Sequence, residues 1–285
     1  MRVFQSIFKF FNSHKFIRGI SSCLIFGFFA LSSLISFGQN SLQTGLVAWY
    51  PFDGNASDMS GNGNHGTVNG ATLSTDRHGQ TNKAYQFDGV DDFIDLNNPS
   101  ILGTTNNFTI LAWVNNGTGT IYGEFNAAAG NSRNYFKVSG NYLGLDQYFP
   151  SGGAVSSLEI LELNQTNSWN LVGYVRAGSS WSFFVHGQLL NSGSNVENYS
   201  GSTPNLGYIG ARAYTYGGYS AGAKDFFTGS IDNVRIYNRA LSAEEVSALY
   251  RLESPNHFAE LNSTVDLEMI HVEPGTFTMG SPLTE

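Results

Sequence analysis

The chain has 285 residues, of which 14% are aromatic, 13% are charged and 33 are glycine. This composition is typical of many short strands joined by tight turns, and it argues against a helical bundle. The formal net charge of −8 disfavours nucleic acid and anionic membranes as partners, because both are polyanions.

The first 38 residues differ in composition from the rest. Basic residues from Arg2 to Arg18 precede the apolar run CLIFGFFALSSLISF, and small residues lie at its end, at Ser36 and Gly38. This order predicts a secretory signal peptide over residues 1–38. A membrane anchor is the alternative, but about 15 apolar residues are few for crossing a bilayer.

Cleavage of this segment would change both the cysteine content and the charge. Cys23 is the only cysteine, so the mature chain would have neither disulfides nor thiol chemistry. Removing four of the 14 basic residues leaves 10 against 22 acidic residues, a net charge of −12. We expect a secreted or cell-surface protein with no membrane span after cleavage and no nucleic-acid partner.

Residues 43–252 contain a succession of short segments rich in β-branched and aromatic residues, bounded by Gly, Asn or Ser. VGYVRAGSSWSFFVHGQLLNSG indicates consecutive hairpins, with a tight turn at His186-Gly187. The other segments are GLVAWYPF, KAYQFDG, DFIDL, FTILAWVN, GTIYGEF, YFKVSG, YLGLDQY, WNLVGYVR, LGYIGAR and GSIDNVRIYN. The pattern predicts an all-β fold, a two-sheet antiparallel jelly-roll sandwich.

One helix is predicted at the end of this domain. In LSAEEVSALYR, Ser242 is followed three residues later by Glu245, which is the pattern of a capping box, and apolar residues follow. The helix should close the domain near Leu252. Residues 253–264 are polar and are interpreted as a linker. Residues 265–285 begin a new strand pattern but are too few to bury a core.

Acidic residues mark both ends of the domain. Asp53, Asn55 and Asp58 lie in a glycine-rich loop after the first strand, and Asp232 alternates with Val234 and Ile236 in the last strand. If the first and last strands are neighbours, these oxygen ligands can share calcium, the ion that prefers carboxylate, amide and carbonyl oxygens. Alternatively, Asp53 and Asp58 are ordinary turn residues that accept backbone N–H groups.

The sequence offers little support for catalysis. Glu159 and Glu162 lie three apart on a predicted strand, so they point to opposite faces and cannot flank one scissile bond. The histidines have no metal-ligand spacing, and no phosphate-binding glycine loop occurs. We predict no catalytic residues within residues 43–252.

Tyrosines suggest where a ligand could bind. Tyr214, Tyr216 and Tyr219 lie among small residues in GYIGARAYTYGGYSAGA, and aromatic rings commonly stack against sugar faces. The alternative is that some of these rings pack in the sandwich while the others decorate a loop.

Several segments resemble a known family. GLVAWYPFDGNASDMSGNGNHGTVNGA, AYQFDGVDDFIDL, FTILAWV and FTGSIDNVRIYNRALSAEEVSALY are similar to signature segments of the laminin-G-like, concanavalin A-type jelly roll of secreted bacterial proteins. The resemblance covers residues 43–252. It implies a two-sheet jelly roll, commonly with a calcium ion between the early loop and the late strand, for which Asp53 and Asp232 match best.

The C-terminal stretch carries a second resemblance. MIHVEPGTFTMGS, residues 269–281, is similar to the opening of the formylglycine-generating, sulfatase-modifying family. The resemblance implies that residues 265–285 are a truncated start of such a domain, whose catalytic cysteines would lie beyond Glu285.

Three functions follow from these patterns. The first is a secreted, calcium-stabilised module that binds carbohydrate or another extracellular ligand. The second is an adhesion module that contacts protein and has no sugar site. The third is the non-catalytic front part of a truncated enzyme of the formylglycine-generating type.

Overall fold

The computed structural model describes residues 42–97, 101–102, 105–126, 132–140, 142–148, 154–160, 168–194, 206–216 and 219–255. For residues 126, 132–133, 147–148, 154–160, 213–216 and 219–222 it describes the backbone only. The predicted signal peptide, the C-terminal stub and most of the predicted linker lie outside these ranges.

The described chain is dominated by strands, and its strand pairs are antiparallel. Their bounds are β1 Leu46–Tyr50, β2 Thr67–Asn69, β3 Thr72–Ser74, β4 Ala84–Asp88, β5 Phe93–Asp95, β6 Asn107–Asn126, β7 Ser132–Ser139, β8 Tyr142–Tyr148, β9 Ala154–Ile160, β10 Trp169–Ala177, β11 Ser180–Val185, β12 Gln188–Gly193, β13 Leu206–Ile209, β14 Arg212–Tyr216, β15 Tyr219–Lys224 and β16 Thr228–Tyr237. One helix, α3 (Ala243–Glu253), follows the last strand.

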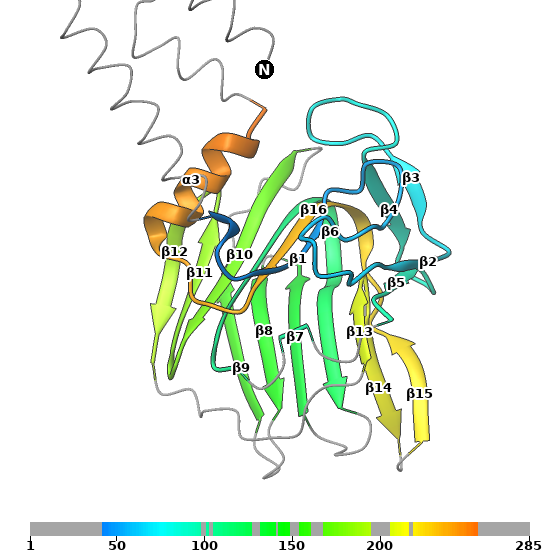
Figure 1. Cartoon of the computed structure of the whole chain (residues 1–285). Coiled ribbons are helices and arrows are strands. Elements are labelled where there is room, and N and C mark those ends of the chain that lie inside the picture. The colour runs from blue at the N-terminus through cyan, green and yellow to red at the C-terminus, as the bar shows by residue number, and fades with distance from the viewer. Residues whose placement is uncertain are drawn as a thin grey trace, which may run out of the picture.

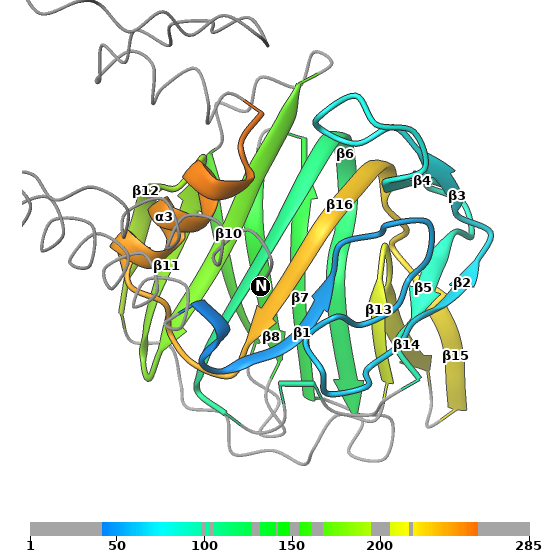
Figure 2. The same ribbon diagram turned by 45° about the horizontal axis from the view of Figure 1, so that its top comes forward.

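Apart from β14 and β15, which pair only with each other as a hairpin, the strands form two sheets that face each other (Figures 1 and 2). Sheet A has the order β12-β11-β10-β6-β16, and the far edge of β16 pairs with β1 over one half and with β4 over the other. Sheet B has the order β9-β8-β7-β6-β13-β5-β2. The predicted antiparallel jelly-roll sandwich is confirmed, and the first and last strands are neighbours as expected.

Strand β6 joins the two sheets. The sequence predicts two strands here, but residues 107–126 form one long strand whose first half pairs in sheet A and whose second half pairs in sheet B. Gly119 lies at the crossing with φ of +117°, and a Cβ there would lie 2.4 Å from the Phe226 carbonyl oxygen. Glycine therefore lets the strand pass from one sheet to the other without a break.

The central strands of sheet A are buried on both faces. Ile110, Ala112 and Val114 of β6 face the core between the sheets, whereas Leu111 and Trp113 face an outer cluster beneath α3. Successive residues of a strand point to opposite faces, so a strand covered on both sides has apolar residues at consecutive positions. This explains why FTILAWV shows no polar alternation.

Helix α3 lies against the outer face of sheet A beside β10, β11 and β12 (Figure 2). The predicted capping box is present, because the Ser242 side chain accepts a bond from the Glu245 N–H and the Glu245 carboxylate accepts one from the Ser242 N–H. The β11–β12 turn abuts the helix, where a Cβ on Gly187 would lie 2.8 Å from that of Tyr250. In the described part of the chain, no helix has the length and apolar composition needed to cross a membrane.

A buried carboxyl group lies in the sheet B half of β6. Glu124 Oε1 accepts hydrogen bonds from the Tyr122 hydroxyl and from the Leu102 N–H, the latter at 2.9 Å. Its Oε2 has no partner among the described residues. Burial raises the pKa of Glu124 from its ordinary value of 4.5 to about 7, so the group is protonated in the folded protein at mildly acidic pH.

We expect Glu124 to make the folded state less stable as pH rises. Between pH 4.5 and 7 the folded protein holds a proton on Glu124 that the unfolded chain has released, so the free energy of unfolding falls with increasing pH, by up to about 3 kcal/mol. E124Q removes this contribution and should make the fall shallower when measured by urea denaturation, leaving the fall due to Asp232, whose pKa burial also raises to about 7.

E244Q provides the matched control. Glu244 is exposed and its pKa is lowered, chiefly by the Ser242 side chain, so this substitution should leave the fall between pH 4.5 and 7 in place. An unchanged profile in E124Q would contradict the assignment of the proton to Glu124.

Candidate functional site

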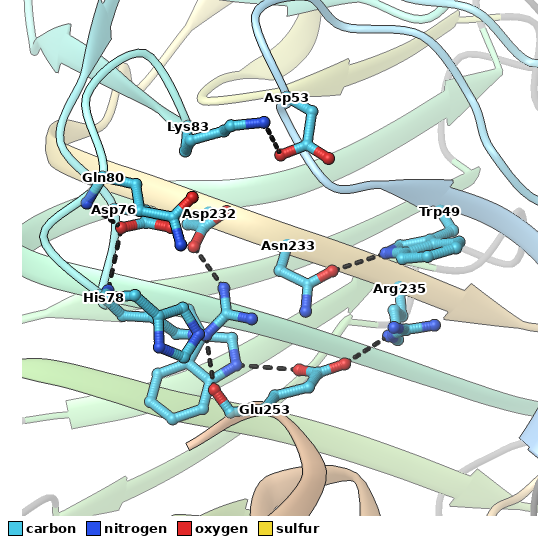
Figure 3. A network of polar contacts seen from close by, with 12 residues as sticks. Trp49, Asp53, Asp76, His78, Gln80, Lys83, Asp232, Asn233, Arg235 and Glu253 are labelled. Carbon is cyan, nitrogen blue, oxygen red and sulfur yellow. Dashed lines mark hydrogen bonds and ion pairs between the residues drawn. The ribbon is translucent and has the colours of Figure 1, made fainter. Parts of the chain in front are cut away.

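A polar cleft of about 260 Å³ opens at the edge of the outer face of sheet A (Figure 3). Four segments line it: the end of β1 with the loop that follows, the β3–β4 loop, the middle of β16, and the end of α3. These segments are far apart in the sequence, and the pairing of β16 with β1 and β4 brings three of them together.

A β-bulge in β16 directs side chains into this cleft. Asn233 has φ of +48°, a left-handed conformation uncommon for residues other than glycine. The pairing with β6 shifts across it, so that Asp232 lies opposite Trp113 while Arg235 lies opposite Leu111. Bulges commonly redirect side chains next to functional sites.

The bulge corrects one sequence-based interpretation. The alternation with Val234 and Ile236 places Asp232 on the inner face, but Val234 and Ile236 belong to the core between the sheets while Asp232 shares the outer face with Trp113. The extra residue reverses the phase of the strand between positions 232 and 234. Asp232 is nevertheless buried, with 1% of its surface exposed.

Arg77 in the β3–β4 loop forms the central ion pair. Its Nη1 atom contacts the carboxylate of Asp232, and its Nε donates to the Glu253 carbonyl oxygen at 2.7 Å. Its guanidinium carbon lies 5.2 Å from the centre of the Trp113 ring. One side chain thus ties the β3–β4 loop to β16 and to the end of α3.

Glu253 is the second centre of the network (Figure 3). Its Oε1 accepts a hydrogen bond from Arg235 Nε at 2.6 Å and its Oε2 accepts one from Trp113 Nε1 at 2.9 Å. The guanidinium of Arg235 lies 4.2 Å from the centre of the Trp49 ring, and the Trp49 indole N–H donates to Asn233 Oδ1 at 2.5 Å. Two arginines therefore stack on two tryptophans, and of these four residues Trp49, Arg77 and Arg235 line the cleft while Trp113 is buried beneath it.

Burial shifts the pKa values of two residues that line the cleft, Asp232 and His78. Desolvation raises the pKa of Asp232 to about 7, and the nearby Arg77 opposes this rise. Partial burial, followed by the charge of Arg77, lowers the pKa of His78 at the rim, so that imidazole is neutral at pH 7. Asp76 Oδ1 accepts the backbone N–H groups of His78 and Gln80.

The four residues predicted as calcium ligands are only partly brought together. Asp53 and Asp232 both line the cleft, but Asp53 pairs with Lys83 at 3.0 Å and Asp232 pairs with Arg77. Asp58 accepts the N–H groups of Trp49, Ser60 and Asn64, and Asn55 accepts the N–H of Ser57. Of the two residues in the alternative interpretation, Asp58 thus accepts backbone N–H groups as a turn residue does, whereas Asp53 pairs with Lys83; Asn55 also accepts a backbone N–H.

These contacts do not fit a shared calcium ion. A divalent cation needs several oxygen ligands that converge on one point. Here side-chain cations occupy the two cleft carboxylates, and backbone donors occupy the two loop residues. Calcium stays a prediction of the sequence.

A different carboxylate group lies in the β4–β5 turn. The carboxylates of Asp88, Asp91 and Asp92 approach within 4.8 Å of one another. Asp88 Oδ1 accepts the N–H of Val90 at 2.8 Å, and Asp92 Oδ2 accepts the N–H of Asp88 at 2.9 Å. Such turn bonds account for these residues without an ion.

The predicted ligand-binding tyrosines lie elsewhere in the fold. Tyr214 and Tyr216 lie on β14 and Tyr219 on β15, a hairpin at the end of the sandwich opposite the β3–β4 loop (Figure 1). Their side chains lie outside what the structure describes, as does that of Glu159, and Glu162 lies outside the described residues altogether. The tyrosine site stays a prediction.

Sequence reasoning missed Arg77, Glu253 and Trp49 as site residues. A loop arginine and a carboxylate at a helix end have no sequence signal of burial. The low charged fraction of 13% was a weak hint, since in such a chain each arginine has few partners to choose from. Only the pairing of distant segments shows that these residues meet.

We expect R77A to be strongly destabilising, because it leaves the Asp232 carboxylate buried without a partner. The free energy of unfolding at pH 8, from urea denaturation, should fall by about 3–5 kcal/mol. The double variant R77A/D232N should recover part of this loss, since it buries no charge.

K83A is the control: it breaks the more exposed pair with Asp53 and should lower the free energy of unfolding by less than about 1 kcal/mol. Equal losses in R77A and K83A would contradict the central role of Arg77.

We expect the melting temperature to be unchanged by EDTA, because the cationic partners of Asp53 and Asp232 are side chains. Differential scanning fluorimetry of protein with EDTA or with added calcium tests this directly. A fall with EDTA that calcium restores would instead support the calcium site predicted from the sequence.

Comparisons with known proteins agree with the observed fold. The family model described as the concanavalin A-like lectin/glucanases superfamily, of laminin G type, matches residues 88–247, more than half of the chain. No curated protein sequence matches the chain.

Solved structures of similar fold include several binding domains. The binding domain of Paraclostridial Mosquitocidal Protein 1 is 16% identical with a TM-score of 0.57, over 74% of this chain and 53% of that one. Domain 4 of AbnA, an extracellular arabinanase from Geobacillus stearothermophilus in complex with arabinotriose, is 22% identical with a TM-score of 0.55, over 72% and 98%. The binding domain of botulinum neurotoxin serotype G is 16% identical with a TM-score of 0.53, over 73% and 51%.

The chain thus spans about half the length of the toxin domains and nearly all of the arabinanase domain. At these identities the likeness shows the fold. Together with the family match, it establishes that the chain belongs to the concanavalin A-like lectin/glucanases superfamily, as a laminin-G-like jelly roll.

Proposed function

We propose that this protein is a secreted, non-catalytic binding module for carbohydrate. The observation that carries the proposal is the match to domain 4 of the arabinanase, which extends over 98% of that domain, whose structure contains arabinotriose. A complete domain of this fold can therefore serve as a sugar-binding unit appended to an enzyme. The predicted signal peptide supports an extracellular location.

The chemistry of the cleft favours binding over hydrolysis. A glycosidase of the usual type needs one free acid and one free carboxylate on either side of the scissile bond. In the cleft, Asp53 and Asp232 are paired with cations and Glu253 accepts two hydrogen bonds. Asp76 accepts two backbone N–H groups. None of these four carboxylates is placed as a free acid opposite a free base.

Contact with a protein is the second candidate function. It is favoured by the toxin binding domains among the structural neighbours, one of which is the receptor binding domain of botulinum neurotoxin type G. The third hypothesis, the front part of a truncated enzyme of the formylglycine-generating type, depends on residues 265–285, which lie outside the described residues.

A glycan array decides between the first two functions. We expect the chain to bind at least one neutral glycan saturably, because the fold offers a polar cleft whose charges are paired within the protein. Binding should persist in 0.5 M salt, since neutral ligands are not held by charge. If no glycan on the array binds, or if all binding is lost in 0.5 M salt, a protein partner is favoured instead.

A further inference from the structure

We propose that the cleft between the β3–β4 loop, the β16 bulge and the end of α3 binds the terminal ring of a neutral saccharide. The inference rests on the proposed function and deepens it, because it assigns the site and the ligand class. It competes with the tyrosine hairpin predicted from the sequence, which lies at the opposite end of the sandwich (Figure 1).

The floor of the cleft is preorganised. The Trp49 ring is held by its hydrogen bond to Asn233 and by the guanidinium of Arg235, which Glu253 anchors in turn. Arg77 is fixed at both Nη1 and Nε. A ligand entering such a site meets groups that already hold their positions, so little ordering entropy is lost on binding.

The charge balance of the cleft selects a neutral ligand. Four acidic side chains line it, Asp53, Asp76, Asp232 and Glu253, against three basic ones, Arg77, Lys83 and Arg235. Each basic side chain is already paired with one of these acids. An anionic sugar would find no unpaired cation and would face the excess carboxylate, so a neutral ring fits the cleft better than an acidic one.

Several polar groups at the cleft remain available to hydroxyl groups. Among the described residues, the Nδ2 group of Asn233, the Oδ2 atom of Asp76 and the side chains of His78 and Gln80 make no hydrogen bond within the protein. They include donors and acceptors, which suits a ring whose hydroxyl groups both donate and accept. His78 and Gln80 are exposed at the rim, where an incoming ligand reaches them first.

The size and walls of the cleft suit one ring. Drug-sized ligands need pockets of about 300–1,000 Å³, and the cleft of about 260 Å³ lies just below that range. Trp49, Pro51 and Leu252 supply apolar wall against which the C–H face of a sugar can pack, and Leu252 is 52% exposed at the rim. We therefore expect recognition of a chain end, with the rest of the glycan outside.

The test measures binding and location together. Arabinotriose, cellotriose and mannotriose are titrated into the full chain by calorimetry, together with sialyllactose as the anionic comparison. In parallel, the indole N–H resonances are followed by NMR, with that of Trp49 assigned through W49F and that of Trp181 on β11 as an internal reference.

The double variant H78A/Q80A removes two ligand-facing side chains without touching the fold. Both residues hold Asp76 through backbone N–H groups, which alanine retains. Loss of two hydrogen bonds should raise Kd about tenfold. T81A, an exposed residue of the same loop that does not line the cleft, is the matched control and should bind like the parent.

The expected result is binding of a neutral trisaccharide that shifts the Trp49 indole resonance and is weakened by H78A/Q80A but not by T81A. The inference falls if a trisaccharide binds while Trp49 is unmoved and H78A/Q80A binds like the parent. Loss of that binding in Y214A/Y216A/Y219A would then assign the ligand to the hairpin, with the proposed function intact. If no glycan binds the parent on the array or in solution, the proposed function fails first and the inference falls with it.

Discussion

The buried contact between Arg77 and Asp232 is the interaction on which the arrangement of the outer face of sheet A depends. Asp232 is almost completely removed from water, and an isolated carboxylate there would be costly. The guanidinium that compensates it comes from a loop about 155 positions away in the sequence, and the same side chain reaches the end of α3 through its Nε. The Arg77 side chain therefore fixes both the position of the β3–β4 loop and that of the end of α3.

The pairing of β1 and β4 along the same edge of β16 makes this contact possible. Both strands add to the edge that does not face β6, and they leave the middle of β16 open between them. The bulge at Asn233 lies in this gap, where neither strand constrains the backbone by pairing. Asp232 and Asn233, which has a left-handed backbone conformation, thus occupy the stretch of this β16 edge that pairs with neither β1 nor β4.

The fold could be predicted from the sequence to a large extent, because its determinants are local. Alternating apolar segments, the turn at His186-Gly187 and the capping box at Ser242 each depend on neighbours within a few residues, and each is present. The candidate site could be predicted from the sequence only in part. The orientation of Asp232 was misjudged because a single extra residue in β16 reverses the alternation, and no sequence rule signals a bulge at an asparagine. Arg77 and Glu253 were missed because their burial depends on segments that meet only in three dimensions.

The same network explains why the cleft is polar. Buried ion pairs contribute little to stability compared with apolar residues of similar volume, and the neighbouring outer face of sheet A shows that apolar packing was available, since Leu111, Leu171 and Val175 fill it beneath α3. Stability alone therefore does not account for two arginines stacked on Trp49 and Trp113. What the charged groups provide is a set of ion pairs and hydrogen bonds that fix the side chains at the floor of the cleft. Ion pairing within the protein leaves hydrogen-bonding groups at the cleft but few unpaired charges, and the proposed binding of a neutral saccharide depends on this property.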